Sequence, residues 1–80
     1  MASFKVIFLP SAEAEFRAVP FPFRRQINQR IMSLIGDPLP SYRERLGESD
    51  KYRLPVHGWH VIYDWNEADG VVTIEVVSKD

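Results

Sequence analysis

The sequence contains no cysteine, so neither disulfides nor thiolate metal sites strengthen this fold. Two histidines are too few for a structural zinc site. No apolar run reaches the length of a membrane span, and the first ten residues lack the basic region and cleavage site of a signal peptide. We therefore expect a cytoplasmic protein that uses no metal or other cofactor and does not bind a membrane.

The chain has 80 residues, which is enough for one domain only. Hydrophobic residues make up 45% of the sequence and charged residues 26%, which is ordinary for a globular domain. We predict a single domain over residues 1–80, with a modest core and a small stability margin.

The net charge of -1 hides an uneven distribution along the chain. Residues 24–53 carry seven basic and four acidic side chains, a local charge of +3, whereas the rest carries -4. A locally basic segment attracts phosphate groups. A solvated helix face followed by a loop has the same composition, so charge alone leaves both interpretations open.

The first half of the sequence predicts a strand and two helices. Residues 3–9 are rich in β-forming side chains, and acidic residues after Ser11 indicate a short helix over about 11–18. Pro22 suits the first turn of a second helix, and Gly36 is a natural end for it. The second helix carries the clearest apolar stripe. The members of this stripe are Phe23, Ile27, Ile31, Leu34 and Ile35.

The second half switches to a period of two, which predicts strands. Residues 37–50 are rich in turn formers and are expected to be a loop. Strands are expected at 51–56, from Trp59 to Trp65, and at 71–77, with Val72, Ile74 and Val76 on one face of the last.

A tight turn at His57-Gly58 is expected to join the first two of these strands. Pro55 indicates that strand 51–56 pairs on one side only at that residue. The predicted fold is α+β, with two N-terminal helices, an αα-hairpin, on one face of a small, mainly antiparallel four-stranded sheet. The element order is β-α-α-β-β-β.

The run YRLPVHGWHVIYD at 52–64 resembles the central hairpin of the RelE/ParE toxin superfamily. Val19-Pro20 and Asp37-Pro38 are similar to the family's Leu-Pro and Asp-Pro pairs on either side of its second helix, and Asp69-Gly70 is similar to the turn of its last hairpin. The resemblance covers nearly the whole chain and implies a toxin of a type II toxin–antitoxin pair, with a cognate antitoxin as partner.

The family implies two alternative targets. RelE-like members are ribosome-dependent endoribonucleases that cut mRNA and inhibit translation, with the 2′-hydroxyl of the RNA as nucleophile, so the protein orients the phosphate, stabilises charge and moves protons. ParE-like members poison DNA gyrase. The expected partners are therefore the ribosome and mRNA, or DNA gyrase; a degenerate toxin that only binds antitoxin is a further alternative.

The resemblance also implies three catalytic residues. Arg53 matches a basic position on the first hairpin strand and is expected to hold the scissile phosphate. His60 replaces an arginine on the second strand and is expected to move a proton. Lys79 lies near the basic residue that follows the last strand and is expected to offset charge. Pro55 occupies a second position that is often basic in the family.

Each catalytic candidate has a structural alternative. Arg53 has Glu75 or Asp64 as candidate partners across the sheet, and His60 has Asp64 or a backbone group. The position of Lys79 near a terminus favours a mobile residue over a catalytic one. Which of these side chains share a face depends on strand register, which the sequence leaves open.

Further basic side chains are candidates for binding RNA, with a solvated surface as the alternative. They are Arg24, Arg25, Arg30, Arg43, Arg45, Lys51 and His57. The position of His57 beside Gly58 favours a turn residue over an RNA contact. Trp59 and Trp65 have stacking on bases as one interpretation, but they share parity with Val61 and Tyr63, which favours the core.

Overall fold

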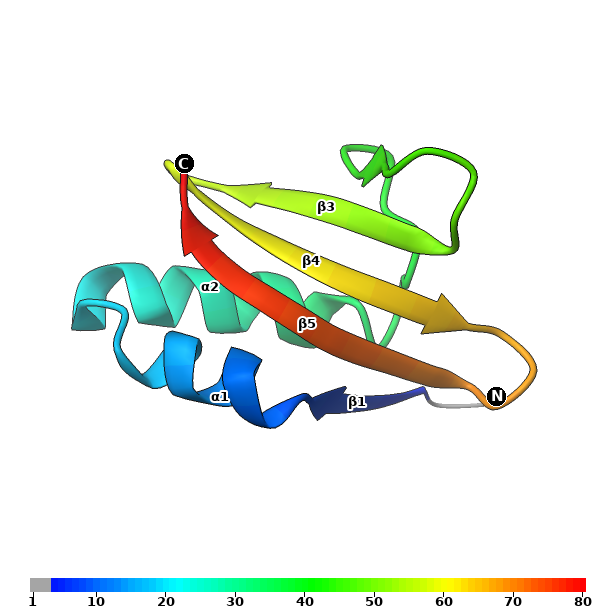
Figure 1. Ribbon diagram of the computed structural model, residues 1–80, viewed down its shortest axis with the longest axis horizontal. Helices are drawn as coiled ribbons and strands as arrows, with labels where there is room; N and C mark the ends of the chain where they lie inside the picture. Colours follow the sequence, from blue (N-terminus) through cyan, green and yellow to red (C-terminus); the bar gives the residue numbers. More distant parts are fainter. Residues whose placement is uncertain (1–3) are drawn as a thin grey trace.

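Two helices and five strands follow one another in the computed structural model, which describes residues 4–80 (Figure 1). The elements are β1 Lys5–Phe8, α1 Pro10–Arg17, α2 Phe21–Ser33, β2 Glu44–Arg45, β3 Lys51–Val56, β4 Trp59–Asn66 and β5 Val71–Lys79. The α+β class and the predicted element order are confirmed, with β2 as an addition. Residue 3 of the strand predicted at 3–9 lies outside the described residues.

The strands form one sheet in the order β1-β5-β4-β3-β2. β1 runs parallel to β5, and all other neighbours are antiparallel. The sheet therefore has five strands, and the prediction of four was wrong. The extra strand, β2, lies inside the segment predicted to be a loop, and its two residues pair with Arg53 and Tyr52. Two residues carry no periodic pattern, so only the pairing reveals this strand.

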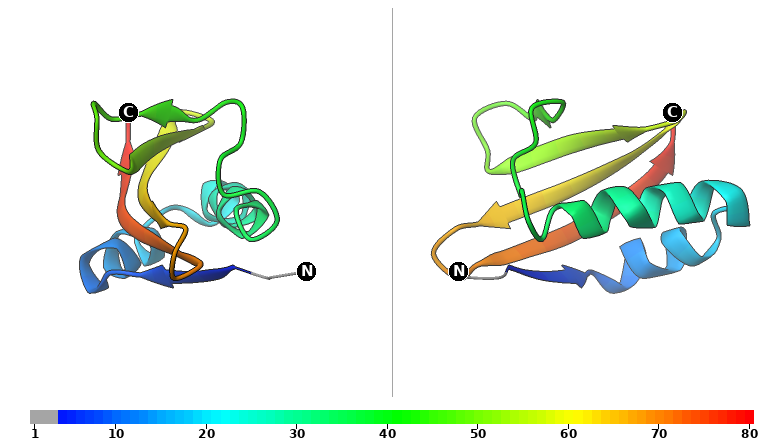
Figure 2. Two further views of the ribbon diagram at one scale, coloured as in Figure 1. Left: turned by 90° about the vertical axis from the view of Figure 1, so that its right-hand side faces the viewer. Right: turned by 180° about the vertical axis from the view of Figure 1, so that it is seen from behind.

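The two helices occupy different places around the sheet. Figures 1 and 2 show α2 lying across one face, while α1 continues the line of β1 along β5. Beyond the end of β1, the Val77 N–H of β5 donates to Glu15 Oε1 of α1 at 3.1 Å. A helix side chain thus satisfies a strand donor at this edge of the sheet. The opposite face of β3, β4 and β5, toward the viewer in Figure 1, has no helix over it.

The helix boundaries depart slightly from the predictions. α1 begins with Pro10 as its first residue, where the missing N–H has no cost, and Ser11 lies inside the helix instead of capping it. Pro22 occupies the first turn of α2 as predicted. α2 ends at Ser33 instead of Gly36, because residues 34–36 make tighter bonds to carbonyls three residues back.

The core lies between α2 and the covered face of the sheet. α2 contributes Ile27 and Ile31, which are fully buried, against β-strand residues at alternate positions. The buried apolar residues are Ala12, Val19, Ile27, Ile31, Leu34, Leu54, Val56, Val61, Tyr63, Val72, Ile74 and Val77. Trp59 and Trp65 are half-buried and pack against this core, which agrees with their parity along the strand.

The β3–β4 hairpin forms as the sequence predicts. His57 and Gly58 both have positive φ, at 48° and 86°, which is the backbone of a type I′ turn. At Pro55, β3 pairs only with β4, because β2 ends short of it. The missing N–H of this proline therefore removes no ladder hydrogen bond on the β2 side.

None of the helices found between residues 4 and 80 is long and apolar enough to cross a membrane.

Candidate functional site

The register between β3 and β4 brings the first two candidate residues to one face. Arg53 lies opposite Ile62, and Pro55 lies opposite His60. Partners in register point to the same side of a sheet. The neighbouring residues Leu54 and Val61 are buried in the core. Arg53 and His60 therefore both lie on the opposite face of the sheet. We call this face, formed by β3, β4 and β5 and free of helices, the open face.

A carboxylate from the end of β5 joins Arg53 to His60. Arg53 Nη2 donates to Asp80 Oδ1 at 2.8 Å, and His60 Nδ1 lies 2.7 Å from the same oxygen. The side chain of His60 is 19% exposed and that of Asp80 is 43% exposed. The cluster is therefore partly enclosed but remains open to a ligand.

Glu44 of β2 holds the other side of the guanidinium. Its Oε1 accepts from Arg53 Nη1 at 2.7 Å. This hydrogen bond is the main cause that raises the pKa of Arg53, and the charge of Asp80 adds to it, while burial acts in the opposite direction. Arg53 therefore stays fully charged, with two of its five N–H groups used by these carboxylates. The strand that the sequence did not predict thus supplies one member of the cluster.

Asp80 reaches the open face because of an irregularity in β5. Ile62 pairs with Val76 but Tyr63 pairs with Ile74, so Glu75 is an extra residue in the ladder, a β-bulge. The bulge reverses which residues of β5 face the core: Val77 is buried, whereas Val76 is opposite Ile62. The prediction that Val76 shares a face with Ile74 was therefore wrong. Sequence alternation alone gave no signal for Asp80.

The alternative partners expected for the catalytic candidates are replaced by others. Lys51 Nζ, on the same face of β3, binds both oxygens of Glu75 at 2.5 and 2.6 Å, so Glu75 is the partner of Lys51 and not of Arg53. His60 binds Asp80 instead of Asp64.

Lys79 is not brought to the cluster. It lies opposite Trp59 in the β4–β5 ladder, and Trp59 packs on the helix side, where its ring lies 6.2 Å from that of Phe23. Lys79 is therefore placed on the opposite side from Arg53 and His60. His57 is exposed at the hairpin turn, and its position is explained by the turn itself.

Three of the candidate RNA-binding arginines contact the segment between α2 and β3 or the side chains beside it. Arg43 Nη1 donates to the carbonyls of Leu39 and Pro40, and its guanidinium lies over the Tyr52 ring. Arg45 donates to backbone carbonyls of residues 48–49. Arg30 lies over the ring of Tyr42, at 4.7 Å from its centroid.

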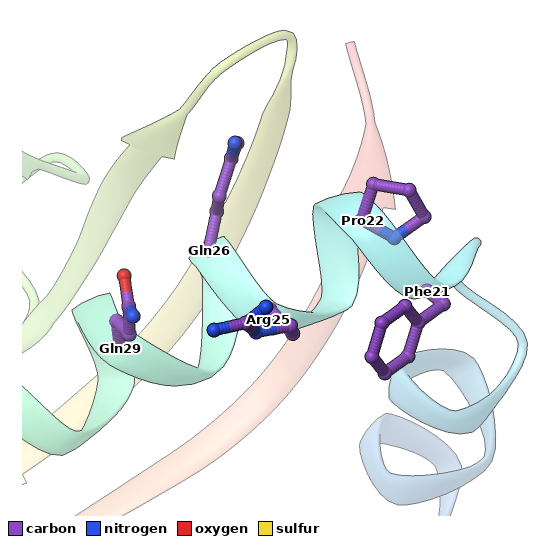
Figure 3. A pocket seen from close by; sticks show the side chains of 5 residues that line it. All are labelled: Phe21, Pro22, Arg25, Gln26 and Gln29. Carbon is purple, nitrogen blue, oxygen red and sulfur yellow. The ribbon is translucent and has the colours of Figure 1, made fainter.

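Arg24 and Arg25 lie on the outer side of α2, away from the open face. Arg25 lines an open hollow of about 500 Å³ together with Phe21 and neighbouring side chains (Figure 3). The side chains in this hollow are Phe21, Pro22, Arg25, Gln26 and Gln29. Arg24 lies over the Phe21 ring and donates to the carbonyl of Arg17 at 3.2 Å. Basic and aromatic side chains thus lie together at the start of α2.

The described part of the chain, residues 4–80, contains no group of three or more His, Asp or Glu side chains that is arranged to hold a metal ion. At the open face, a guanidinium lies beside an imidazole, and one carboxylate joins them. Such a pair suits an anionic ligand that gives up or receives a proton.

No family model matches the chain, and no curated protein matches it. Solved structures do match. The isolated RelE toxin from E. coli superimposes with a TM-score of 0.85 at 22% identity and covers 98% of this chain and 84% of that one. In the archaeal RelE–RelB complex from Pyrococcus horikoshii the TM-score is 0.82 at 21% identity, with 98% and 96% covered.

A third structure is the RelBE2 toxin–antitoxin complex from Mycobacterium tuberculosis, with a TM-score of 0.83 at 15% identity. It covers 99% of this chain and 100% of the other. In each comparison the match spans nearly all of this chain and between 84% and 100% of the other. The chain has the fold of the RelE toxins.

Proposed function

We propose that the protein is the toxin of a type II toxin–antitoxin pair and cuts mRNA on the ribosome, which inhibits translation in the cytoplasm. One observation carries the proposal. On a RelE fold, the register places a guanidinium and an imidazole side by side on the open face, at Arg53 and His60. These are the two groups needed to hold a phosphodiester and to move a proton at its side.

The proposed reaction uses the RNA itself as nucleophile. Arg53 binds the phosphate with its unused N–H groups and stabilises the charge that develops on it. His60 takes the proton of the adjacent 2′-hydroxyl, and the freed oxygen attacks phosphorus. The bond from phosphorus to the 5′-oxygen breaks, and this oxygen takes a proton from water. The products are a 2′,3′-cyclic phosphate and a 5′-hydroxyl end.

The charges on the open face support a requirement for the ribosome. Both Arg53 and Lys51 are already paired with carboxylates, so free RNA meets little net positive potential there. The ribosome holds the mRNA in place and supplies the positioning that this face lacks. The basic outer side of α2, with Arg24 and Arg25, is the proposed contact to ribosomal RNA phosphates.

Cleavage of a defined mRNA on translating ribosomes tests the proposal. We expect the wild-type protein to cut, and Arg53→Ala to lower the cleavage rate about 10²- to 10³-fold, because a charge-stabilising donor is removed. His60→Ala is expected to lower it by at least about 10²-fold. Arg17→Ala, on the exposed side of α1, is the matched control. Unchanged cleavage in both site variants rules the assignment out.

A second candidate function is a binding protein that needs no catalytic groups, either a gyrase poison or a toxin that only binds its antitoxin. The paired state of the open-face cations Lys51 and Arg53 favours it. Intact mRNA on translating ribosomes together with a stalled DNA gyrase decides for the gyrase poison. Intact mRNA, active gyrase and a bound antitoxin decide for the degenerate toxin.

A cognate antitoxin is the partner that both functions imply. RelE proteins similar in fold were solved together with RelB, and this chain offers exposed apolar side chains on α2, such as Phe21 and Phe23, to a partner segment. Growth arrest on expression, relieved by co-expression of the neighbouring reading frame, is the expected result.

A further inference from the structure

Asp80 contacts His60 through one specific ring nitrogen. Its Oδ1 lies 2.7 Å from His60 Nδ1 and also accepts from Arg53 Nη2 at 2.8 Å. An ionised carboxylate can only accept hydrogen bonds, so the hydrogen of the imidazole must be on Nδ1. The same oxygen accepts from Arg53 Nη2, which is also the geometry of an acceptor-only carboxylate.

The consequence lies at the other nitrogen of the ring. With the hydrogen on Nδ1, neutral His60 presents a lone pair at Nε2. No side chain or backbone group between residues 4 and 80 forms a hydrogen bond with Nε2. We propose that Asp80 is the positioning residue of this site, which fixes His60 as the Nδ1–H tautomer and makes Nε2 the atom that accepts a proton. The part of the proposal that concerns RNA rests on the function proposed above.

The arrangement also stabilises the charged form that the reaction creates. When Nε2 takes the proton of the 2′-hydroxyl, His60 becomes an imidazolium, and Asp80 lies in contact with it to offset the new charge. The side chain of His60 is 19% exposed, so solvent screens this interaction only in part. Asp80 itself neither gains nor loses a proton.

Arg53 keeps its own role in this arrangement. Glu44 and Asp80 each take one N–H of the guanidinium, which leaves three for an incoming phosphate. One carboxylate thus orients both the phosphate-binding group and the proton acceptor. Preorganisation of this kind lowers the cost of orienting groups during the reaction.

The tautomer of His60 is measured directly by the nitrogen-15 chemical shifts of its ring at a pH where the ring is neutral. In the wild-type protein we expect the Nδ1–H form to predominate. In Asp80→Asn we expect the Nε2–H form to take over, because it is the form that free imidazole side chains prefer and the amide can donate to Nδ1. Glu44→Gln removes the other carboxylate from Arg53 without touching His60, and is expected to keep the wild-type tautomer.

Cleavage on translating ribosomes gives the second measurement. Asp80→Asn is expected to lower kcat about 100-fold with little change in KM. In this variant Nε2 of His60 carries a hydrogen and no longer accepts a proton, whereas Arg53 still binds the phosphate. Asp80→Glu retains an acceptor and is expected to restore part of the rate and the Nδ1–H tautomer. If Asp80→Asn does not fold, two variants remain. Asp80→Glu moves the carboxylate that contacts His60, and Glu44→Gln removes a carboxylate that contacts Arg53 alone, so the effects on His60 and on Arg53 are still separated.

Two results overturn the inference. One is an Nε2–H tautomer in the wild-type protein, or an unchanged tautomer in Asp80→Asn. The other is faster cleavage by Asp80→Asn, which makes Asp80 a competitor of the phosphate. If the tautomer shifts as expected but wild-type protein leaves mRNA intact, the proposed nuclease function fails and the assignment of Asp80 to His60 stands.

Discussion

At the scale of single residues, carboxylates determine the charge of the open face. Glu75 pairs with Lys51, and Glu44 and Asp80 both pair with Arg53, so three carboxylates face two cations. These side chains are all at least partly exposed, so each pair adds little to stability. Their importance is functional: they hold the Arg53 guanidinium in place and leave three of its N–H groups for a phosphate.

Tyr63 is the residue whose ionisation affects stability. It is fully buried, and its hydroxyl donates to the Pro38 carbonyl at 2.7 Å. Burial raises the pKa of Tyr63 well above its usual range. In the unfolded chain the phenol ionises near its ordinary pKa of about 10. The free energy of unfolding therefore shows no effect of Tyr63 below about pH 10 and falls above it, because only the unfolded state gains from ionisation.

Tyr63→Phe is expected to flatten this alkaline decline. Above about pH 10 the slope of unfolding free energy against pH should fall in magnitude by up to about 1.4 kcal/mol per unit. At neutral pH the variant lacks the hydrogen bond to Pro38, at a cost of about 1 kcal/mol. Urea unfolding at several pH values measures both effects. Tyr42→Phe, at an exposed ring, serves as control, and equal alkaline slopes in wild type and Tyr63→Phe contradict the prediction.

At the scale of secondary-structure elements, the hairpin between β3 and β4 holds Arg53 and His60 in register. Its turn needs two residues with positive φ, which His57 and Gly58 provide. A shift of one residue in this hairpin moves His60 to the helix side and breaks the site. The turn at His57 and Gly58 is therefore as important for the site as Arg53 and His60 themselves.

Gly58→Ala tests the importance of the turn. A Cβ at Gly58 meets no atom within 4 Å, so any cost comes from the backbone conformation alone. We expect a decrease of about 1–2 kcal/mol in the free energy of unfolding. Gly36→Ala is the matched control, since Gly36 has no positive φ and a Cβ there only just reaches Ser33 O at 4.0 Å. Equal effects of both substitutions on urea unfolding would contradict the prediction.

Sequence patterns predicted the elements whose signals are local. Pro55 and the His57-Gly58 turn act over a few residues and were interpreted correctly. Ile27, Ile31 and Leu34 of the apolar stripe are buried as predicted, whereas Phe23 is 41% exposed. β2 was missed because Glu44 and Arg45 become a strand only by pairing with β3. Asp80 was missed as a site residue because the bulge at Glu75 reverses its side, and alternation cannot show where a strand gains a residue.

At the scale of the whole molecule, the basic groups lie on two opposite sides. Arg53 and His60 are on the open face, whereas Arg24 and Arg25 are on α2, across the sheet (Figures 1 and 2). A single flat surface cannot contact both sides at once. A large particle that surrounds the protein can, which is consistent with a ribosome-bound toxin.

The proposed binding to ribosomes should depend on salt concentration through the basic side chains of α2. For the double variant Arg24→Gln/Arg25→Gln we expect weaker binding and a smaller slope of log affinity against log salt concentration, by about 0.7–0.9 for each phosphate that the protein no longer neutralises. The cleavage rate of bound protein should stay unchanged, because both residues are far from the open face. Arg17→Gln is the control, since Arg17 already pairs with Glu13. An unaltered slope in the double variant argues against this mode of binding.

The bulge in β5 has a consequence for how related sequences vary. The extra residue at Glu75 places Asp80 on the open face. The face on which this last side chain lies therefore depends on the bulge and on whether the number of residues between Ile74 and Asp80 is odd or even. A homologue with the same number of residues there but a regular ladder without the bulge keeps every site residue in an alignment, yet turns its last acidic side chain toward the helices. Loss of one residue together with the bulge restores the original side.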